Sequence, residues 1–118
     1  YLEELNPVGY TIDTSGLYYK YSVAGTGITP AATDTIYGWY KGTLPDGTVI
    51  DDVGAGNKLI TFSDSDVPEG VRLGLWLTKT GGAADLILPS YLGYGNKGKG
   101  VVDPYQTLFY QIRLDSIK

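Results

Sequence analysis

The sequence predicts a single α+β domain, in which four or five antiparallel β-strands pack against one short helix. Three observations support this fold class. The 118 residues are enough for one hydrophobic core without a metal ion or disulfide bonds. Eleven Tyr and seventeen Gly accompany Thr, Val and Ile in short runs, which is typical of strands separated by turns. Only one stretch, residues 67–75, carries apolar side chains at helical spacing.

The first two strands are predicted from their composition and alternation. In residues 17–23 the odd positions are apolar, whereas Lys20 and Ser22 are polar, and this period of two is that of a half-buried strand. Residues 33–44 form the next strand.

A hairpin is predicted after this second strand. Pro45 presets φ and Gly47 suits a left-handed position, so the chain should turn back into a strand at residues 49–50. Residues 51–57 are rich in Gly and Asp and predict a bulged loop. A further strand is expected at residues 58–62.

The single helix is predicted from Val67, Val71 and Leu75, which share one helical face at i, i+4 and i+8. Asp66 is the expected N-cap residue. Pro68 is tolerated in the first turn, where its missing N–H has no helical partner.

The C-terminal part predicts two longer strands. Gly81 and Gly82 should end the helix, and residues 83–88 and 107–117 follow as strands joined by the long loop 89–106. Alternation predicts the inward-facing residues of these strands, namely Ala84, Leu86 and Leu88 in the first and Leu108, Tyr110, Ile112 and Leu114 in the second.

The first thirteen residues have no clear period, so we expect residues 1–13 to be an N-terminal extension and residues 14–118 to be the domain. Because the chain begins at Tyr1 and contains no Met, we expect it to be a piece of a longer product. The missing part could carry a secretory signal or a lipid anchor, and we therefore expect a periplasmic or cell-envelope location.

Composition excludes several classes of function. The chain has no Cys and no His, which rules out thiol nucleophiles, imidazole metal ligands and His-dependent catalytic triads. A net charge of −4 with scattered basic residues argues against a nucleic-acid partner. No apolar run is long enough for a transmembrane segment. We expect no metal ion and no cofactor.

Two short motifs have simpler explanations than ligand binding. Residues 93–98 have the glycine spacing of a dinucleotide-binding turn, but no helical pattern follows to meet a pyrophosphate, which favours a flexible loop. Asp64 and Asp66 lie close together without the Glu of a calcium loop, and acidic residues before a helix suit its dipole.

An ordered series of motifs is the most specific feature of the chain. It comprises residues 14–20 (TSGLYYK), 24–27 (AGTG), 40–51 (YKGTLPDGTVID), 67–70 (VPEG), 88–95 (LPSYLGYG) and 104–114 (PYQTLFYQIRL). In content and in order over residues 14–117, this series resembles the FKBP family of peptidyl-prolyl cis/trans isomerases.

The resemblance implies a twisted antiparallel half-barrel around the helix, with a shallow apolar pocket between helix and sheet. It implies binding of proline-containing polypeptides and isomerisation of their X-Pro bonds. Tyr94 would donate a hydrogen bond to the carbonyl oxygen before proline, and Asp51 would act at the pocket edge. The walls would come from Tyr40, Ile50, Val67, Pro68, Val71, Val101, Val102 and Tyr110, with Leu59 or Ile60 as one further wall.

Two positions depart from the family pattern. Val71 stands where the family usually has a Trp floor, and Pro68 lacks the backbone N–H that commonly holds a ligand carbonyl. We therefore expect weak macrolide binding and reduced activity. A catalytically inactive peptide-binding or chaperone-like module is the alternative, and a sugar-binding β domain, suggested by the Tyr and Trp content, is opposed by the ordered motifs.

Overall fold

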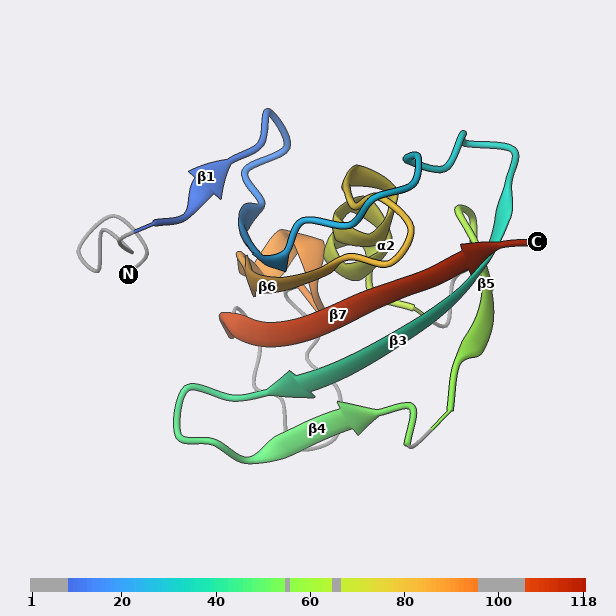
Figure 1. Ribbon diagram of the computed structural model, residues 1–118. Helices are drawn as coiled ribbons and strands as arrows, with labels where there is room; N and C mark the ends of the chain where they lie inside the picture. The colour runs from blue at the N-terminus through green and yellow to red at the C-terminus, as the bar shows by residue number, and fades with distance from the viewer. Residues whose placement is uncertain (1–8, 55, 65–66, 96–105) are drawn as a thin grey trace.

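The computed structural model describes residues 9–54, 56–64, 67–95 and 106–118, and within these it has a seven-stranded antiparallel sheet with one helix against it (Figure 1). The order along the sheet is β1-β2-β6-β7-β3-β4, and β5 also pairs with β3. The elements are β1 (Thr11–Ile12), β2 (Tyr18–Val23), β3 (Thr35–Thr43), β4 (Val49–Asp52), β5 (Lys58–Thr61), α2 (Glu69–Leu77), β6 (Ala83–Leu88), the 3-10 turn η1 (Ser90–Leu92) and β7 (Leu108–Ile117). The predicted α+β class is confirmed, with more short strands than expected.

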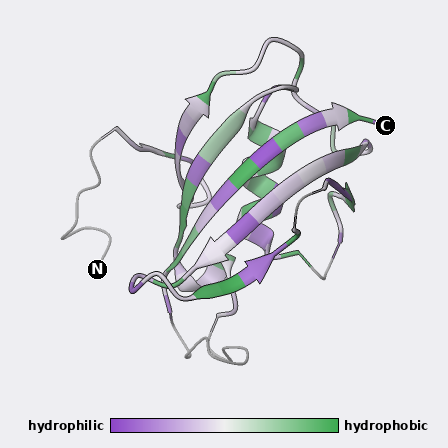
Figure 2. Cartoon of the chain, turned by 60° about the horizontal axis from the view of Figure 1, so that its bottom comes forward, coloured by the Kyte–Doolittle hydropathy of each residue, from purple (hydrophilic) through white to green (hydrophobic). Residues whose placement is uncertain are grey.

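The core lies between α2 and the inner face of β6 and β7. Alternating hydropathy along β7 is visible in Figure 2, and each inward residue predicted for these two strands is at most 2% exposed. Val67, Val71 and Leu75 are buried to the same degree. The predicted helical face is confirmed for Val71 and Leu75, whereas Val67 precedes the helix, which begins at Glu69. No helix of the described segments is long and apolar enough to cross a membrane.

The helix approaches the sheet closely because two of its buried residues are glycines. A Cβ built on Gly70 would lie 2.5 Å from Leu88 Cγ, and one built on Gly74 would lie 2.5 Å from Leu86 Cδ1. Pro68 takes the N-cap position rather than a place in the first turn, and its carbonyl accepts from the Val71 N–H at 3.0 Å. The predicted cap, Asp66, lies outside the described residues.

The hairpin between β3 and β4 forms as predicted. The Leu44 N–H donates to the Thr48 carbonyl at 2.9 Å, and Gly47 has a φ of +92°. The loop expected from residue 51 onward begins later, because Asp51 and Asp52 still pair with β3. The long β3 supplies them with backbone partners, which local composition did not indicate.

Strand β2 departs from the expected half-buried pattern. Leu17, just before it, is completely buried, whereas Tyr21 is 42% and Val23 is 53% exposed. The Tyr21 hydroxyl reaches the last carbonyl of α2, donating to Leu77 at 2.6 Å. Because β2 pairs with β6 along its length but with β1 only at Tyr18 and Tyr19, its second half is an open edge of the sheet.

Candidate active site

The inner face of the sheet carries a row of residues that brings distant parts of the chain together. The strand registers pair Asp51 with Gly42 and Gly42 with Tyr110. Neighbouring strands are about 4.8 Å apart, so the backbones of Asp51 and Tyr110, two strands apart, are separated by about 10 Å. The residue between them has no side chain, which leaves a gap on the inner face.

The Tyr110 side chain fills this gap. A Cβ on Gly42 would lie 2.5 Å from Tyr110 Cζ, so the ring rests directly on the backbone of β3. The Tyr110 hydroxyl then donates a hydrogen bond to Asp51 Oδ2 at 3.2 Å. Tyr110 is only 1% exposed, whereas Asp51 is half-buried. Asp51, the carboxylate predicted at the pocket edge, is therefore hydrogen-bonded to a tyrosine of the core.

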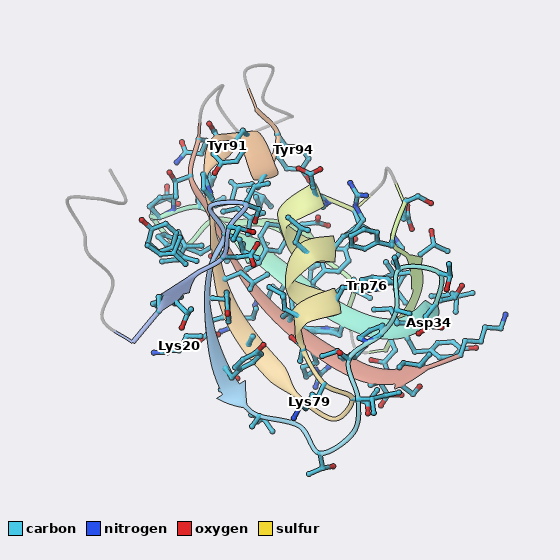
Figure 3. All side chains as sticks on the ribbon, turned by 90° about the horizontal axis from the view of Figure 1, so that it is seen from above. Lys20, Asp34, Trp76, Lys79, Tyr91 and Tyr94 are labelled. Atoms are coloured by element: carbon cyan, nitrogen blue, oxygen red, sulfur yellow. The ribbon has the colours of Figure 1, made fainter. Side chains whose placement is uncertain are left out.

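Tyr94 joins this pair from the segment that follows η1. It packs against the core and lies beside the first turn of α2, as Figure 3 shows. The Tyr94 and Tyr110 side chains are hydrogen-bonded to each other. Burial, assisted by the neighbouring Tyr94 and Asp51, raises the pKa of the Tyr110 phenol far above its ordinary value of 10.0. Tyr110 therefore stays a neutral hydrogen-bond donor.

Apolar side chains surround this polar group. The Tyr40 ring lies 6.1 Å from the Tyr110 ring, measured between centroids. Val67 and Val71 lie next to them in the core cluster, and Pro68 is buried at the start of α2. Ile50 is partly buried against the same core.

Of the remaining predicted wall residues, the structure supports Ile60 and does not describe Val101 and Val102. Ile60 is completely buried and Leu59 is 44% exposed, which leaves Ile60 as the one that faces the core. Val101 and Val102 lie outside the described residues. The structure thus brings together Tyr94, Tyr110, Asp51 and Tyr40 and leaves these two valines undescribed.

Gly42 is the residue that the sequence analysis missed. An isolated glycine inside a strand pattern signals a close approach of another group to the backbone, and this signal was available at residue 42. The partner could not be identified in the same way, because it depends on the order of β4, β3 and β7.

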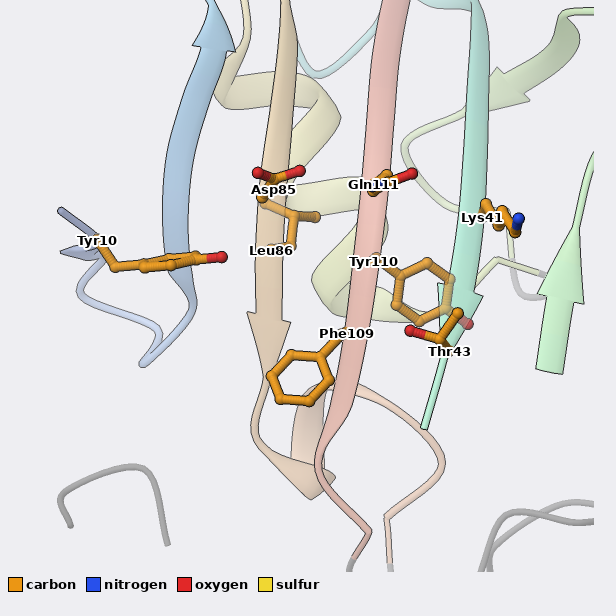
Figure 4. Close-up of a pocket in the computed structure, with 8 residues that line it drawn as sticks. All are labelled: Tyr10, Lys41, Thr43, Asp85, Leu86, Phe109, Tyr110 and Gln111. Carbon is orange, nitrogen blue, oxygen red and sulfur yellow. The ribbon is translucent and has the colours of Figure 1, made fainter. Parts of the chain in front are cut away.

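A separate hollow of about 320 Å³ lies on the opposite, outer face of the sheet (Figure 4). Its lining includes Tyr10, Lys41, Asp85, Phe109 and Gln111. These sheet residues alternate with the inward ones, so the hollow opens on the other face of the sheet from Tyr94, although the inward residues Leu86 and Tyr110 also border it.

Comparisons with known proteins identify the family of the chain. The sequence profile of the family described as FKBP-type peptidyl-prolyl cis-trans isomerase matches residues 26–115. The "Outer membrane protein MIP" of Legionella longbeachae is 39% identical over 111 residues, which cover 93% of this chain and 48% of that protein. The chain spans less than half the length of this relative.

Solved structures share the fold. The peptidyl-prolyl cis-trans isomerase of Pseudomonas syringae pv. tomato has a TM-score of 0.86 at 27% identity, covering 98% of this chain and 86% of that one. FkpA from Escherichia coli has a TM-score of 0.85 at 30% identity, covering 98% of this chain and 55% of that one. Profile, relatives and fold together show that the chain belongs to the FKBP-type peptidyl-prolyl cis-trans isomerase family.

Proposed function

We propose that this domain isomerises X-Pro peptide bonds of polypeptide substrates at the site around Tyr94, Tyr110 and Asp51. The observation that supports this most is the placement of three polar groups, linked by hydrogen bonds, among buried apolar side chains. The family membership supports the same reaction. Activity, substrates and partners of the full-length protein are part of this proposal.

Rotation about an X-Pro bond needs no covalent chemistry. The barrier of about 18 to 20 kcal/mol comes from amide resonance, which is lost in the twisted transition state. The planar amide is more dipolar than the twisted one, so an apolar pocket disfavours the ground state more than the transition state. Walls such as Tyr40, Ile50 and Val71 supply this environment, and a chain without Cys and His can provide it.

The polar residues would add orientation. Tyr94 would donate its hydroxyl proton to the carbonyl oxygen of the residue before proline, which fixes the carbonyl while the prolyl side rotates. Asp51 would meet the twisted amide at the pocket edge electrostatically. Both roles rest on the family resemblance and on the closeness of these residues to Tyr110.

A protease-free isomerisation assay tests the proposal, for example by NMR exchange between cis and trans forms of a Leu-Pro peptide. Tyr94→Phe removes one hydroxyl and should lower kcat/KM by the value of one hydrogen bond, about 0.5 to 1.5 kcal/mol or roughly threefold to tenfold. Tyr21→Phe is the matched control, because it removes a hydroxyl from the edge strand β2, away from the site.

The outcomes separate the candidate functions. Full activity in Tyr94→Phe would remove Tyr94 from the mechanism. A wild-type domain that binds the peptide without accelerating its exchange would instead support the inactive peptide-binding module.

We infer an envelope location for the full-length protein, supported by the name of the Legionella relative, which is an outer membrane protein. Fractionation of cells that express the full-length gene tests this. Recovery in the cytoplasmic fraction alone would contradict it.

A further inference from the structure

The hydrogen bonds of Tyr110 can be assigned a direction from its single proton and its pKa. A phenol has one proton to donate and an ionised carboxylate only accepts, so the Tyr110 hydroxyl donates to Asp51 Oδ2. The hydrogen bond with Tyr94 raises the pKa of Tyr110, which is the effect of a bond that the protonated Tyr110 donates and not of one that it accepts. The Tyr110 proton is thus directed at Asp51 and Tyr94 together, and the Tyr94 proton is left for the substrate carbonyl.

We propose that the Tyr110 hydroxyl is a positioning group, which links Tyr94 to Asp51 in one hydrogen-bonded chain and so holds both for the reaction. This inference rests on the proposed isomerase function. The proposal gives the Tyr110 hydroxyl a role separate from that of its ring in the pocket wall. If only the ring mattered, Tyr110→Phe would keep full isomerase activity.

The surroundings of Tyr110 make it suited to this task. Its ring is held between the core and the backbone of Gly42, so the hydroxyl is fixed in place. By contrast, Asp51 is half-buried near the end of a short strand, and Tyr94 lies in a loop segment. The rigid residue therefore orients the two less constrained ones.

Removing the hydroxyl should affect catalysis more than folding. Tyr110→Phe keeps the ring over Gly42, and we expect kcat/KM to fall roughly threefold to tenfold, mainly through kcat, the range expected for one hydrogen bond. Tyr21→Phe, which loses a hydroxyl bonded to a backbone carbonyl, should keep wild-type activity.

A double-mutant cycle separates positioning from a structural role. We expect Tyr110→Phe to have little further effect in an Asp51→Ala background and a reduced effect in a Tyr94→Phe background, since the group acts through these residues. Additive effects, or full activity of Tyr110→Phe, would overturn the proposal.

A second measurement does not depend on activity. The buried hydroxyl proton of Tyr110 should give a slowly exchanging NMR resonance that disappears in Tyr110→Phe and shifts in both Asp51→Ala and Tyr94→Phe. If the wild-type domain proved inactive, the proposed function would fail, while this resonance would still decide whether the chain of hydrogen bonds exists. A resonance unaffected by either substitution would rule out the link.

Discussion

Tyr110 combines a ring in the hydrophobic core with a hydroxyl that is fully engaged in hydrogen bonds. Burial of such a group without a partner would be costly, and Asp51 and Tyr94 remove this cost. The same environment keeps the phenol neutral, because burial and the neighbouring Asp51 and Tyr94 raise its pKa above 10.0. This shift has a consequence for stability in alkali.

The stability of the domain should fall as pH rises above about 10, where tyrosines of the unfolded chain ionise. Tyr110 keeps its proton in the folded state, so its contribution is complete below the unfolded pKa and declines above it, by up to about 1.4 kcal/mol per pH unit. Urea unfolding from about pH 9 to about pH 11 should show this decline, and Tyr110→Phe should flatten it.

Tyr21→Phe is again the control. The pKa of Tyr21 is also raised by partial burial, so removal of this phenol should flatten the curve less than removal of Tyr110. An equal decline in wild type and Tyr110→Phe would contradict the assigned environment.

Pro68 and Val71 should weaken the binding of macrolides that typical family members bind. Loss of aromatic stacking at Val71 costs about 0.5 to 1.5 kcal/mol. A ligand carbonyl left unpaired at Pro68 costs about 1 to 3 kcal/mol. Together these predict a dissociation constant raised roughly tenfold to a thousandfold, measurable by titration calorimetry.

Val71→Trp should recover part of this affinity. Because Val71 is completely buried, the variant must first be shown to fold by circular dichroism. Wild-type binding as tight as that of a typical family member would show that neither residue matters to the ligand.

At the scale of elements, the position of α2 depends on its glycines. Gly70 lies in the first turn, where an added methyl gains little helix stability, and a Cβ built on it would lie 2.5 Å from Leu88 Cγ and 3.1 Å from Leu92 Cβ. These atoms are close to the backbone and cannot swing away. We therefore expect Gly70→Ala to destabilise the domain by about 1 to 3 kcal/mol, measured by urea unfolding.

Gly56→Ala provides the comparison, since nothing lies within 4 Å of a Cβ built there. This variant should be as stable as wild type. Equal stability of the two variants would mean that α2 can move away from the sheet without cost.

Sequence patterns predicted some elements better than others for a physical reason. The predicted inward residues of β6 and β7 are all buried, because each strand has a neighbour on both sides and α2 on its inner face. In β6 the outward Ile87 is buried as well. Residues 17–23 showed similar alternation, yet Tyr21 and Val23 are exposed at the open edge of β2. Periodicity reports which face a residue takes, and strand order decides whether that face is covered.

The site shows the same limit. Tyr94 and Asp51 were predicted from motif order, but the Tyr110 hydrogen bond depends on the pairing of β4 with β3 and of β3 with β7. Local composition even favoured a loop at Asp51. Long-range register is not encoded in any single segment, so the connection between these residues had to come from the structure.

At the scale of the whole molecule, the site joins segments spread over most of the chain. Tyr40, Asp51, Tyr94 and Tyr110 come from β3, β4, the segment after η1 and β7. The N-terminal part contributes differently. Strand β1 pairs with β2, the Asp13 N–H donates to the Leu17 carbonyl at 2.8 Å, and the Lys20 ammonium lies over the Tyr10 ring.

A chain that begins at Thr14 should therefore fold and keep its isomerase activity, with a stability lowered by about 1 to 3 kcal/mol from these lost contacts. A chain that begins at Gly9 retains β1 and is the control. Urea unfolding and the isomerisation assay check both. A Thr14 chain that fails to fold would show that the extension is an integral part of the domain.

The ring of Tyr110 and the bare backbone of Gly42 also restrict how this site can evolve. Any side chain at residue 42 collides with the ring, so a mutation there is harmful as long as the tyrosine remains. The reverse order is open, because a smaller residue at 110 first vacates the space. Residues 42 and 110 are thus epistatic: a side chain at residue 42 is tolerated only after Tyr110 has been replaced by a smaller residue.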